Sequence, residues 1–254
     1  MTRTIFAGIL MMAAGAAGLM GQPKQPAPKS KAELDALQAL FQQAQNPDAV
    51  VKLGDEFITK FADTDFKENV LVLMADAWHQ KKDENKAQIY ADQALAVNPK
   101  SYQASILVAE IIAKGAREND LDIQEKAANA EKYAKAAIDS VKDAPKPRPD
   151  LPDAQWDDFK KSIMGRAHGA IGIINITRKK YDAAASELKA AYEADPQPAY
   201  MVQQASALQA GGKNAEALAI CETLLKDPTL HPAIKSVAEQ IKAKAGAKAP
   251  GGNE

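Results

Sequence analysis

Small and apolar residues recur at intervals of three and four along most of the chain after residue 30, a spacing typical of amphipathic helices. The clearest stretch places them at Leu71, Met74, Ala75 and Trp78, and again at Ala87, Ala91 and Ala94 before Pro99. Proline cannot donate to the helical ladder, so Pro99 predicts the end of the second helix. The stretch therefore predicts two consecutive helices joined by a turn.

A second stretch follows the same template. Its positions are His168, Ile171, Gly172 and Asn175, then Tyr181, Ala184, Leu188, Ala191 and Pro196. Small residues at matching places, such as Ala75 and Gly172, allow two antiparallel helices to cross closely. Together the two stretches resemble the tetratricopeptide repeat, a helix-turn-helix unit of about 34 residues.

The spacing of the small residues extends this repeat along the chain. Ala75 and Ala109 lie 34 residues apart, and Gly172 and Ala205 lie 33 residues apart. The first helices that this spacing predicts are 102–114 and 199–210. Asn214 is expected to cap the next helix, at 215–226, because its side chain can accept from free helical N–H groups.

The middle of the chain holds 29 residues more than one repeat unit requires. We expect them in two places, near 117–125 and near 143–161, with a long helix running from Asp153 to about residue 179. Pro145, Pro147, Pro149 and Pro152 predict a polyproline-type spacer in the second place, with a docking peptide as the alternative.

The ends of the repeat array are atypical, as expected for units that cap a stack. The pair at 31–62 is degenerate and has Gly54 inside its second helix, where glycine weakens helical structure. A single amphipathic helix at 232–245 closes the array. The predicted fold is all-α, a helix-turn-helix repeat solenoid of about five helix pairs plus a C-terminal capping helix.

The N-terminus has the features of a secretory signal. Arg3 precedes an apolar run from Ile5 to Met20, and cleavage after Ala16 or after Gly21 fits the small residues there. An uncleaved membrane anchor is the alternative. The predicted organisation is a signal peptide at 1–21, a Pro-rich linker at 22–30, a repeat domain at 31–245 with a Pro-rich insertion at 143–153, and a disordered tail at 246–254. The protein is expected to be exported, to the periplasm or cell envelope.

Composition and the candidate reactive residues reduce the range of possible functions. Lys and Arg total 32 against 33 Asp and Glu, so there is no basic excess for nucleic acid. The single cysteine, Cys221, is expected in the core, and His79, His168 and His231 form no metal-binding motif. Catalytic motifs such as a phosphate loop are absent from the sequence. We therefore expect no enzyme activity, no metal, no cofactor and no small-molecule substrate.

The family resemblance implies a concave groove lined by the first helix of each pair, which binds protein or peptide segments. The positions that correspond to this groove are Asn69, Val72, Asp76, His79, Gln103, Ile106, Glu110, Arg166, Ile173, Ile176 and Gln209. Family members that clamp chaperone C-termini use Lys and Asn at positions that hold Val72 and Asp76 here, so a co-chaperone role is disfavoured.

These observations favour a non-catalytic scaffold or adaptor of the cell envelope. The alternatives are an accessory subunit of an envelope enzyme or assembly complex, and a self-assembling structural protein. The membrane is expected as a partner only if the N-terminal segment is retained.

We predict that the mature protein begins after Ala16 or Gly21. Intact-mass spectrometry of the protein recovered from its native host measures this directly. Recovery of chains that still begin at Met1 contradicts the signal-peptide interpretation.

Overall fold

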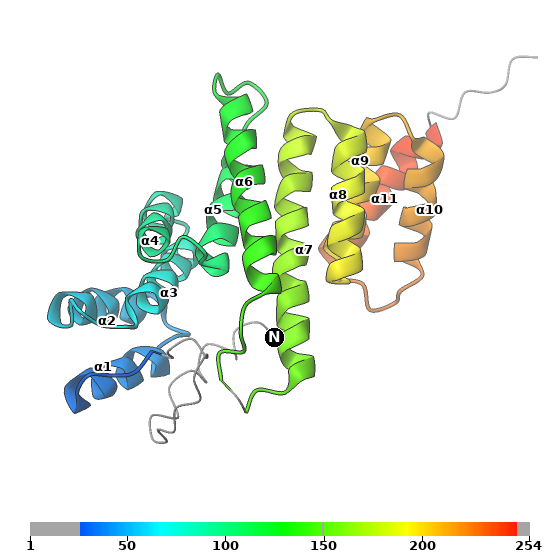
Figure 1. Ribbon diagram of the computed structural model, residues 1–254. Coiled ribbons are helices and arrows are strands. Elements are labelled where there is room, and N and C mark those ends of the chain that lie inside the picture. The colour runs from blue at the N-terminus through cyan, green and yellow to red at the C-terminus, as the bar shows by residue number, and fades with distance from the viewer. Residues whose placement is uncertain (1–25, 149, 248–254) are drawn as a thin grey trace, which may run out of the picture. The chain divides into compact units, whose positions relative to one another are not determined.

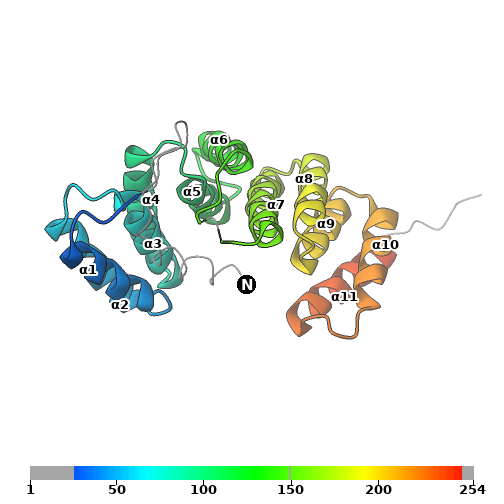
Figure 2. The same cartoon turned by 60° about the horizontal axis from the view of Figure 1, so that its bottom comes forward.

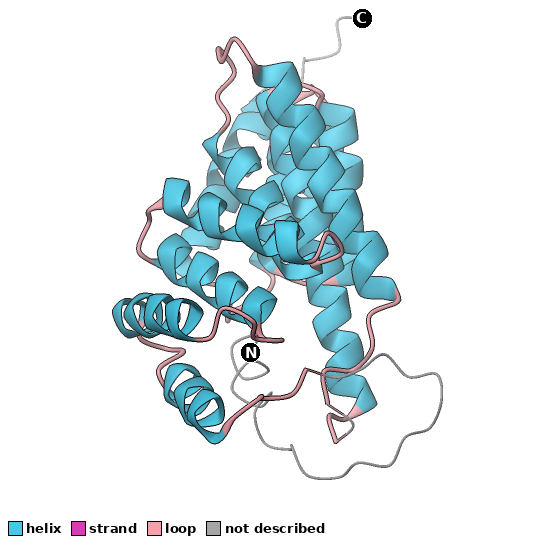
Figure 3. Cartoon of the chain, turned by 60° about the vertical axis from the view of Figure 1, so that its left-hand side comes forward, coloured by secondary structure: helices cyan, strands magenta, loops and turns pink. Residues whose placement is uncertain are grey.

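The computed structural model describes residues 26–148 and 150–247. The predicted signal peptide, residues 22–25 of the predicted linker and residues 248–254 of the predicted tail therefore lie outside the described residues. Within the described residues all regular secondary structure is helical and there is no strand (Figure 3). The all-α repeat fold predicted from the sequence is confirmed.

Eleven helices follow one another through the described residues (Figure 1). They are α1 (Lys31–Gln42), α2 (Pro47–Lys60), α3 (Lys67–Gln80), α4 (Glu84–Val97), α5 (Tyr102–Gly115), α6 (Ile123–Lys142), α7 (Asp153–Thr177), α8 (Tyr181–Ala194), α9 (Pro198–Ala210), α10 (Asn214–Leu225) and α11 (Pro232–Ala247). The five predicted pairs and the final helix are all present, and α11 ends two residues beyond its predicted limit.

The chain divides into two compact units. Unit 1 runs to Val108 and includes Ala144–Asp153, whereas unit 2 comprises Ala109–Asp143 and the described residues from Ala154 onward. One boundary along the chain falls inside α5, and the other two lie at the ends of the Pro-rich segment 144–153.

In unit 1, α2 packs against both α1 and α3, and α3 packs against α4 (Figure 2). Leu37, Leu40, Val50 and Met74 are fully buried in its core. A Cβ at Gly54 would lie 2.5 Å from the Met74 sulfur, so glycine here allows α2 to approach α3 closely. Glycine lowers the intrinsic stability of a helix, and the close packing of α2 on α3 offsets this loss at Gly54.

The start of α1 is fixed to the turn before α3. The buried Glu33 accepts hydrogen bonds from the Lys29 N–H at 2.6 Å and from the Thr64 hydroxyl at 2.5 Å. Ser30 caps the helix by accepting from the Glu33 N–H at 3.1 Å. The degenerate first pair is therefore held in place by polar contacts as well as by its apolar core.

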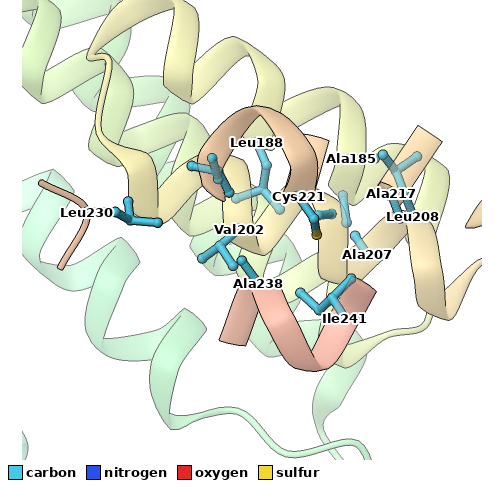
Figure 4. Close-up of a cluster of buried hydrophobic side chains, with 13 residues drawn as sticks. Ala185, Leu188, Val202, Ala207, Leu208, Ala217, Cys221, Leu230, Ala238 and Ile241 are labelled. Carbon is cyan, nitrogen blue, oxygen red and sulfur yellow. The ribbon is translucent and has the colours of Figure 1, made fainter. Parts of the chain in front are cut away.

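In unit 2, α8 packs on α9, and α9, α10 and α11 all pack on one another. Cys221 lies among the buried side chains of this cluster, together with Leu188, Val202 and Ile241 (Figure 4). Burial raises the pKa of the Cys221 thiol, which keeps it protonated and unreactive. The core position predicted for Cys221 is confirmed.

The turns between the helices of three pairs share one geometry. Lys82, Lys179 and Gly212 have positive φ angles of 65°, 57° and 84°. In each turn the following N–H bonds to a carbonyl five residues earlier, as in Asp83 to Trp78 and Lys180 to Asn175. This is the Schellman arrangement, which normally places glycine at the left-handed position.

The extra residues in the middle of the chain lengthen helices as well as loops. α7 spans 25 residues and ends at Thr177, two residues before its predicted limit. α6 also extends to 20 residues, which the sequence analysis did not anticipate. The Pro-rich connection folds back on itself, because Lys146 Nζ donates to Asp153 at 2.6 Å and Leu151 is buried.

The predicted Asn214 cap is wrong. Asn214 is the first residue of α10, Lys213 occupies the cap position, and no side-chain capping bond is formed. Asn214 Oδ1 is instead buried without a hydrogen-bond partner among the described residues. The Schellman turn at Gly212 starts the helix one residue earlier than the sequence suggested.

We predict that Lys82→Gly raises the free energy of unfolding by about 0.5–1 kcal/mol. A left-handed non-glycine residue costs about 1–2 kcal/mol, part of which is offset by the greater freedom of glycine in the unfolded chain. The matched control is Gly212→Ala, expected to lower the free energy of unfolding by about 1 kcal/mol. Urea titrations followed by circular dichroism measure both changes, and destabilisation by Lys82→Gly would contradict the strain at this turn.

Candidate partner-binding surface

The predicted surface residues of unit 1 differ in accessibility. Asn69 and Gln103 are half-buried and Asp76 is exposed, where it accepts a hydrogen bond from Gln80 Nε2 at 2.8 Å. His79 is half-buried and its Nδ1 lies 2.7 Å from Glu84 Oε2 on α4. These four side chains remain candidates for partner contact.

Val72 and Ile106 do not form accessible surface. Val72 is 4% exposed and Ile106 is fully buried. Both lie three residues before the small residue of their helix, Ala75 or Ala109. At this position the side chain fills the space between helices, so both residues contribute to packing and neither is available to a partner.

Unit 2 brings two predicted surface residues together. Arg166 Nε and Nη2 on α7 donate to the two carboxylate oxygens of Glu110 on α5, at 2.9 Å each. The Glu110 side chain is only 12% exposed, and Lys114 Nζ lies 3.7 Å from it. A bidentate ion pair of this kind fixes both side chains in one geometry. The sequence predicted both residues as surface positions but did not predict their pairing.

Tyr200 lies close enough to Glu110 and Arg166 to feel their charges, and the sequence analysis did not predict it as a site residue. Its ring lies over Gly169 of α7, where a Cβ would lie 2.7 Å from the ring. Burial, followed by the charges of Asp195 and Glu110, raises the pKa of Tyr200 to about 12, so the phenol stays protonated at neutral pH. The sequence did contain a sign of this contact at Gly169. The matching position in the other first helices holds a larger apolar residue, Val72, Ile106 or Val202, so a glycine there leaves space for a neighbouring side chain.

The remaining predicted residues lie on α7 and α9. Ile173 is half-buried and is not part of the buried cluster, so part of its side chain meets solvent. Ile176 instead packs against the buried cluster around Cys221. Gln209 is half-buried near the end of α9. Ile173 is therefore the apolar side chain most available to a partner on this part of α7.

The described residues contain no group of three or more His, Cys, Asp or Glu side chains placed to hold a metal ion. His168 Nδ1 lies 2.8 Å from Glu187 Oε2, which joins α7 to α8 much as His79 and Glu84 join α3 to α4. None of the helices from α1 to α11 combines the length and the apolar character needed to cross a membrane.

Comparison with known proteins gives structural neighbours only. The sequence matches no protein-family model and no curated protein. A thermophilic TPR protein of Thermus thermophilus is 17% identical with a TM-score of 0.49, covering 82% of this chain and 98% of that chain. The Assembly Chaperone of RpL4 (Acl4) is 12% identical with a TM-score of 0.46, covering 85% and 97%. The tetratricopeptide-like character of this chain is evident in its own helix pairs, crossings and turns.

We predict a coupling free energy of about 1 kcal/mol or more between Glu110 and Arg166. The pair is bidentate and Glu110 is mostly buried, although the partial exposure of Arg166 limits the value. A double-mutant cycle with Glu110→Ala and Arg166→Ala measures it. The exposed pair Lys189 and Glu193 is the control and should couple by less than about 0.5 kcal/mol. Equal coupling in both cycles would show that the Glu110 pair is an ordinary surface contact.

Proposed function

We propose that this protein is a non-catalytic interaction scaffold that binds protein or peptide segments on the first helices of its repeats. One observation carries the proposal. The helix crossings are packed by small residues, while the outward positions of the first helices keep half-buried or exposed side chains of mixed polarity, from Asp76 on α3 to Ile173 on α7.

The character of these positions supports recognition rather than chemistry. Glu110 and Arg166 are locked in an ion pair, and each described helical histidine is bound to a glutamate. An active site requires convergent polar groups around an open position, whereas these groups are already paired with one another. A helical scaffold with ordered side chains needs only surface complementarity to bind a partner.

The proposed location is the cell envelope. The apolar segment from Ile5 to Met20 and the Pro-rich linker that follows support this part of the proposal. The partner is therefore sought in envelope extract, with the chain from Gln22 as bait.

We predict that Ile173→Asp reduces recovery of the partner about tenfold or more. A charge placed at an apolar contact removes buried apolar area and adds a desolvation cost. The test is affinity capture from envelope extract, quantified by mass spectrometry. Ile176 is unsuitable for this test, because an aspartate there would disrupt the core cluster that it packs against.

The matched control is Ile89→Asp, which makes the same change at an exposed isoleucine of α4, a second helix. Partner recovery should survive this control and should also survive Ile173→Val. Circular dichroism must show equal helicity in all variants. Equal recovery with Ile173→Asp and Ile89→Asp would exclude the α7 surface as the binding site.

A further inference from the structure

The two helix pairs that share one sequence template differ at the end of their second helix. In the pair α3–α4, Asn98 follows the last residue of α4, and its Nδ2 donates to Glu68 Oε2 on α3 at 2.8 Å. In the pair α7–α8, Asp195 takes the place of Asn98, since each precedes a proline. Gly165 takes the place of Glu68, since each lies seven residues before the small crossing residue of its helix. The second pair therefore has a carboxylate at this position and no side chain at Gly165 to meet it.

The carboxylate of Asp195 has little to bind in its own chain. It accepts a hydrogen bond from the Gln197 side-chain amide at 3.0 Å and forms no ion pair within the described residues. Asp195 is half-buried against α7, where a Cβ at Gly165 would lie 2.6 Å from the Asp195 Cβ. It does not cap α9, because Gln197 is the cap residue of that helix and no side-chain capping bond is formed. The folded chain therefore leaves the charge of Asp195 uncompensated.

The backbone of α8 adds to the negative charge at this point. Asp195 directly follows Ala194, at the carbonyl end of the helix, which carries a partial negative charge. Cations are favoured at such an end, yet the last turn of α8 contains no basic residue. A carboxylate here opposes the helix dipole, so a cation supplied from outside the chain would relieve the repulsion.

Arg166, which is next to Gly165 on α7, does not supply that cation. Its guanidinium binds both carboxylate oxygens of Glu110 and is held toward α5. The surroundings of Tyr200 show the resulting balance of charge. Apart from burial, which is the largest cause, Asp195 and Glu110 raise the pKa of Tyr200 more than Arg166 lowers it. The surface beside α7 is therefore negative at Tyr200, although it contains an arginine.

An aromatic ring lies one helical turn from this carboxylate. Tyr200 on α9 packs on Gly169, which is four residues, or about 6 Å along the helix axis, after Gly165. Lysine and arginine side chains stack on aromatic rings and also pair with carboxylates. We propose that Asp195 and Tyr200 bind a lysine or arginine side chain of the partner segment.

This inference rests on the proposed function and deepens it, because it gives the partner segment a charge and a spacing. Ile173 lies eight residues after Gly165 on α7, which corresponds to about 12 Å along the helix axis. An extended chain covers that distance in about four residues. We therefore expect the partner to carry a basic residue about four positions from an apolar residue that contacts Ile173. An acidic partner would be repelled by Asp195 and by the end of α8.

The test selects binding peptides from a display library of random short sequences. The full chain is the bait, as wild type and as Asp195→Asn, a change that keeps the shape of the side chain and reproduces the residue at position 98. We expect the wild type, but not Asp195→Asn, to enrich peptides with lysine or arginine about four residues from an apolar residue. The matched control is Glu193→Gln, which removes an exposed carboxylate of α8 and should enrich the same peptides as the wild type.

Binding of one selected peptide is then measured by calorimetry with purified variants. Asp195→Asn should weaken binding roughly tenfold, and so should exchange of the basic residue of the peptide for methionine. The two changes together should weaken binding no more than either alone, because they remove the same contact. Tyr200→Phe should retain most of the affinity, since the ring remains. The melting temperature of Asp195→Asn should be equal or higher, whereas a structural role for this carboxylate would lower it.

Three results would overturn the inference. They are enrichment of the same peptides by the wild type and Asp195→Asn, a selected consensus without basic residues, and additive losses in the double-mutant cycle. If Ile173→Asp abolishes binding of peptides that Asp195→Asn still binds normally, the inference fails while the proposed function stands. Basic peptides that require Asp195 but not Ile173 would support the site at Asp195 and exclude the surface around Ile173.

Discussion

The close crossing of helices is the constraint on which the rest of this structure depends. In unit 2 a Cβ at Gly172 would lie 2.6 Å from Leu188 Cγ, and one at Gly165 would lie 2.6 Å from the Asp195 Cβ. Neither position therefore tolerates a larger residue without displacing the facing helix, because interiors are packed to the density of organic crystals. The small residues set how near the helices lie, and the larger apolar residues fill the space that remains.

Because of this constraint, the repeat could be recognised from the sequence. Ala75 and Ala109 lie 34 residues apart and Gly172 and Ala205 lie 33 residues apart, and all four are buried. Features that depend on contacts distant in sequence were less predictable. The added length of α6 follows from a row of buried alanines whose partners the sequence does not name, and the absent Asn214 cap follows from the backbone geometry of the turn at Gly212.

The surface was predicted less completely than the core. Register along a helix correctly placed Glu110 and Arg166 on first helices, but it assigned Val72 and Ile106 to a surface that they do not reach. Helical spacing gives the direction of a side chain relative to its own helix, whereas accessibility depends on the neighbouring helix. The position of Tyr200 shows the same dependence, since its ring occupies the space left by Gly169.

Separation of packing positions from outward positions would also allow the proposed scaffold to acquire specificity. The residue after each small crossing residue differs from one first helix to the next. It is the acidic Asp76 on α3, the ion-paired Glu110 on α5, the apolar Ile173 on α7 and the hydroxyl-bearing Ser206 on α9. These changes alter charge and polarity without changing the crossing, because the packed neighbour remains Ala or Gly. The inserted residues act in the same way, since they lengthen the connection between α5 and α6 while both helices keep buried alanines. Binding properties can therefore vary from one helix pair to the next while the packing of the pairs stays constant.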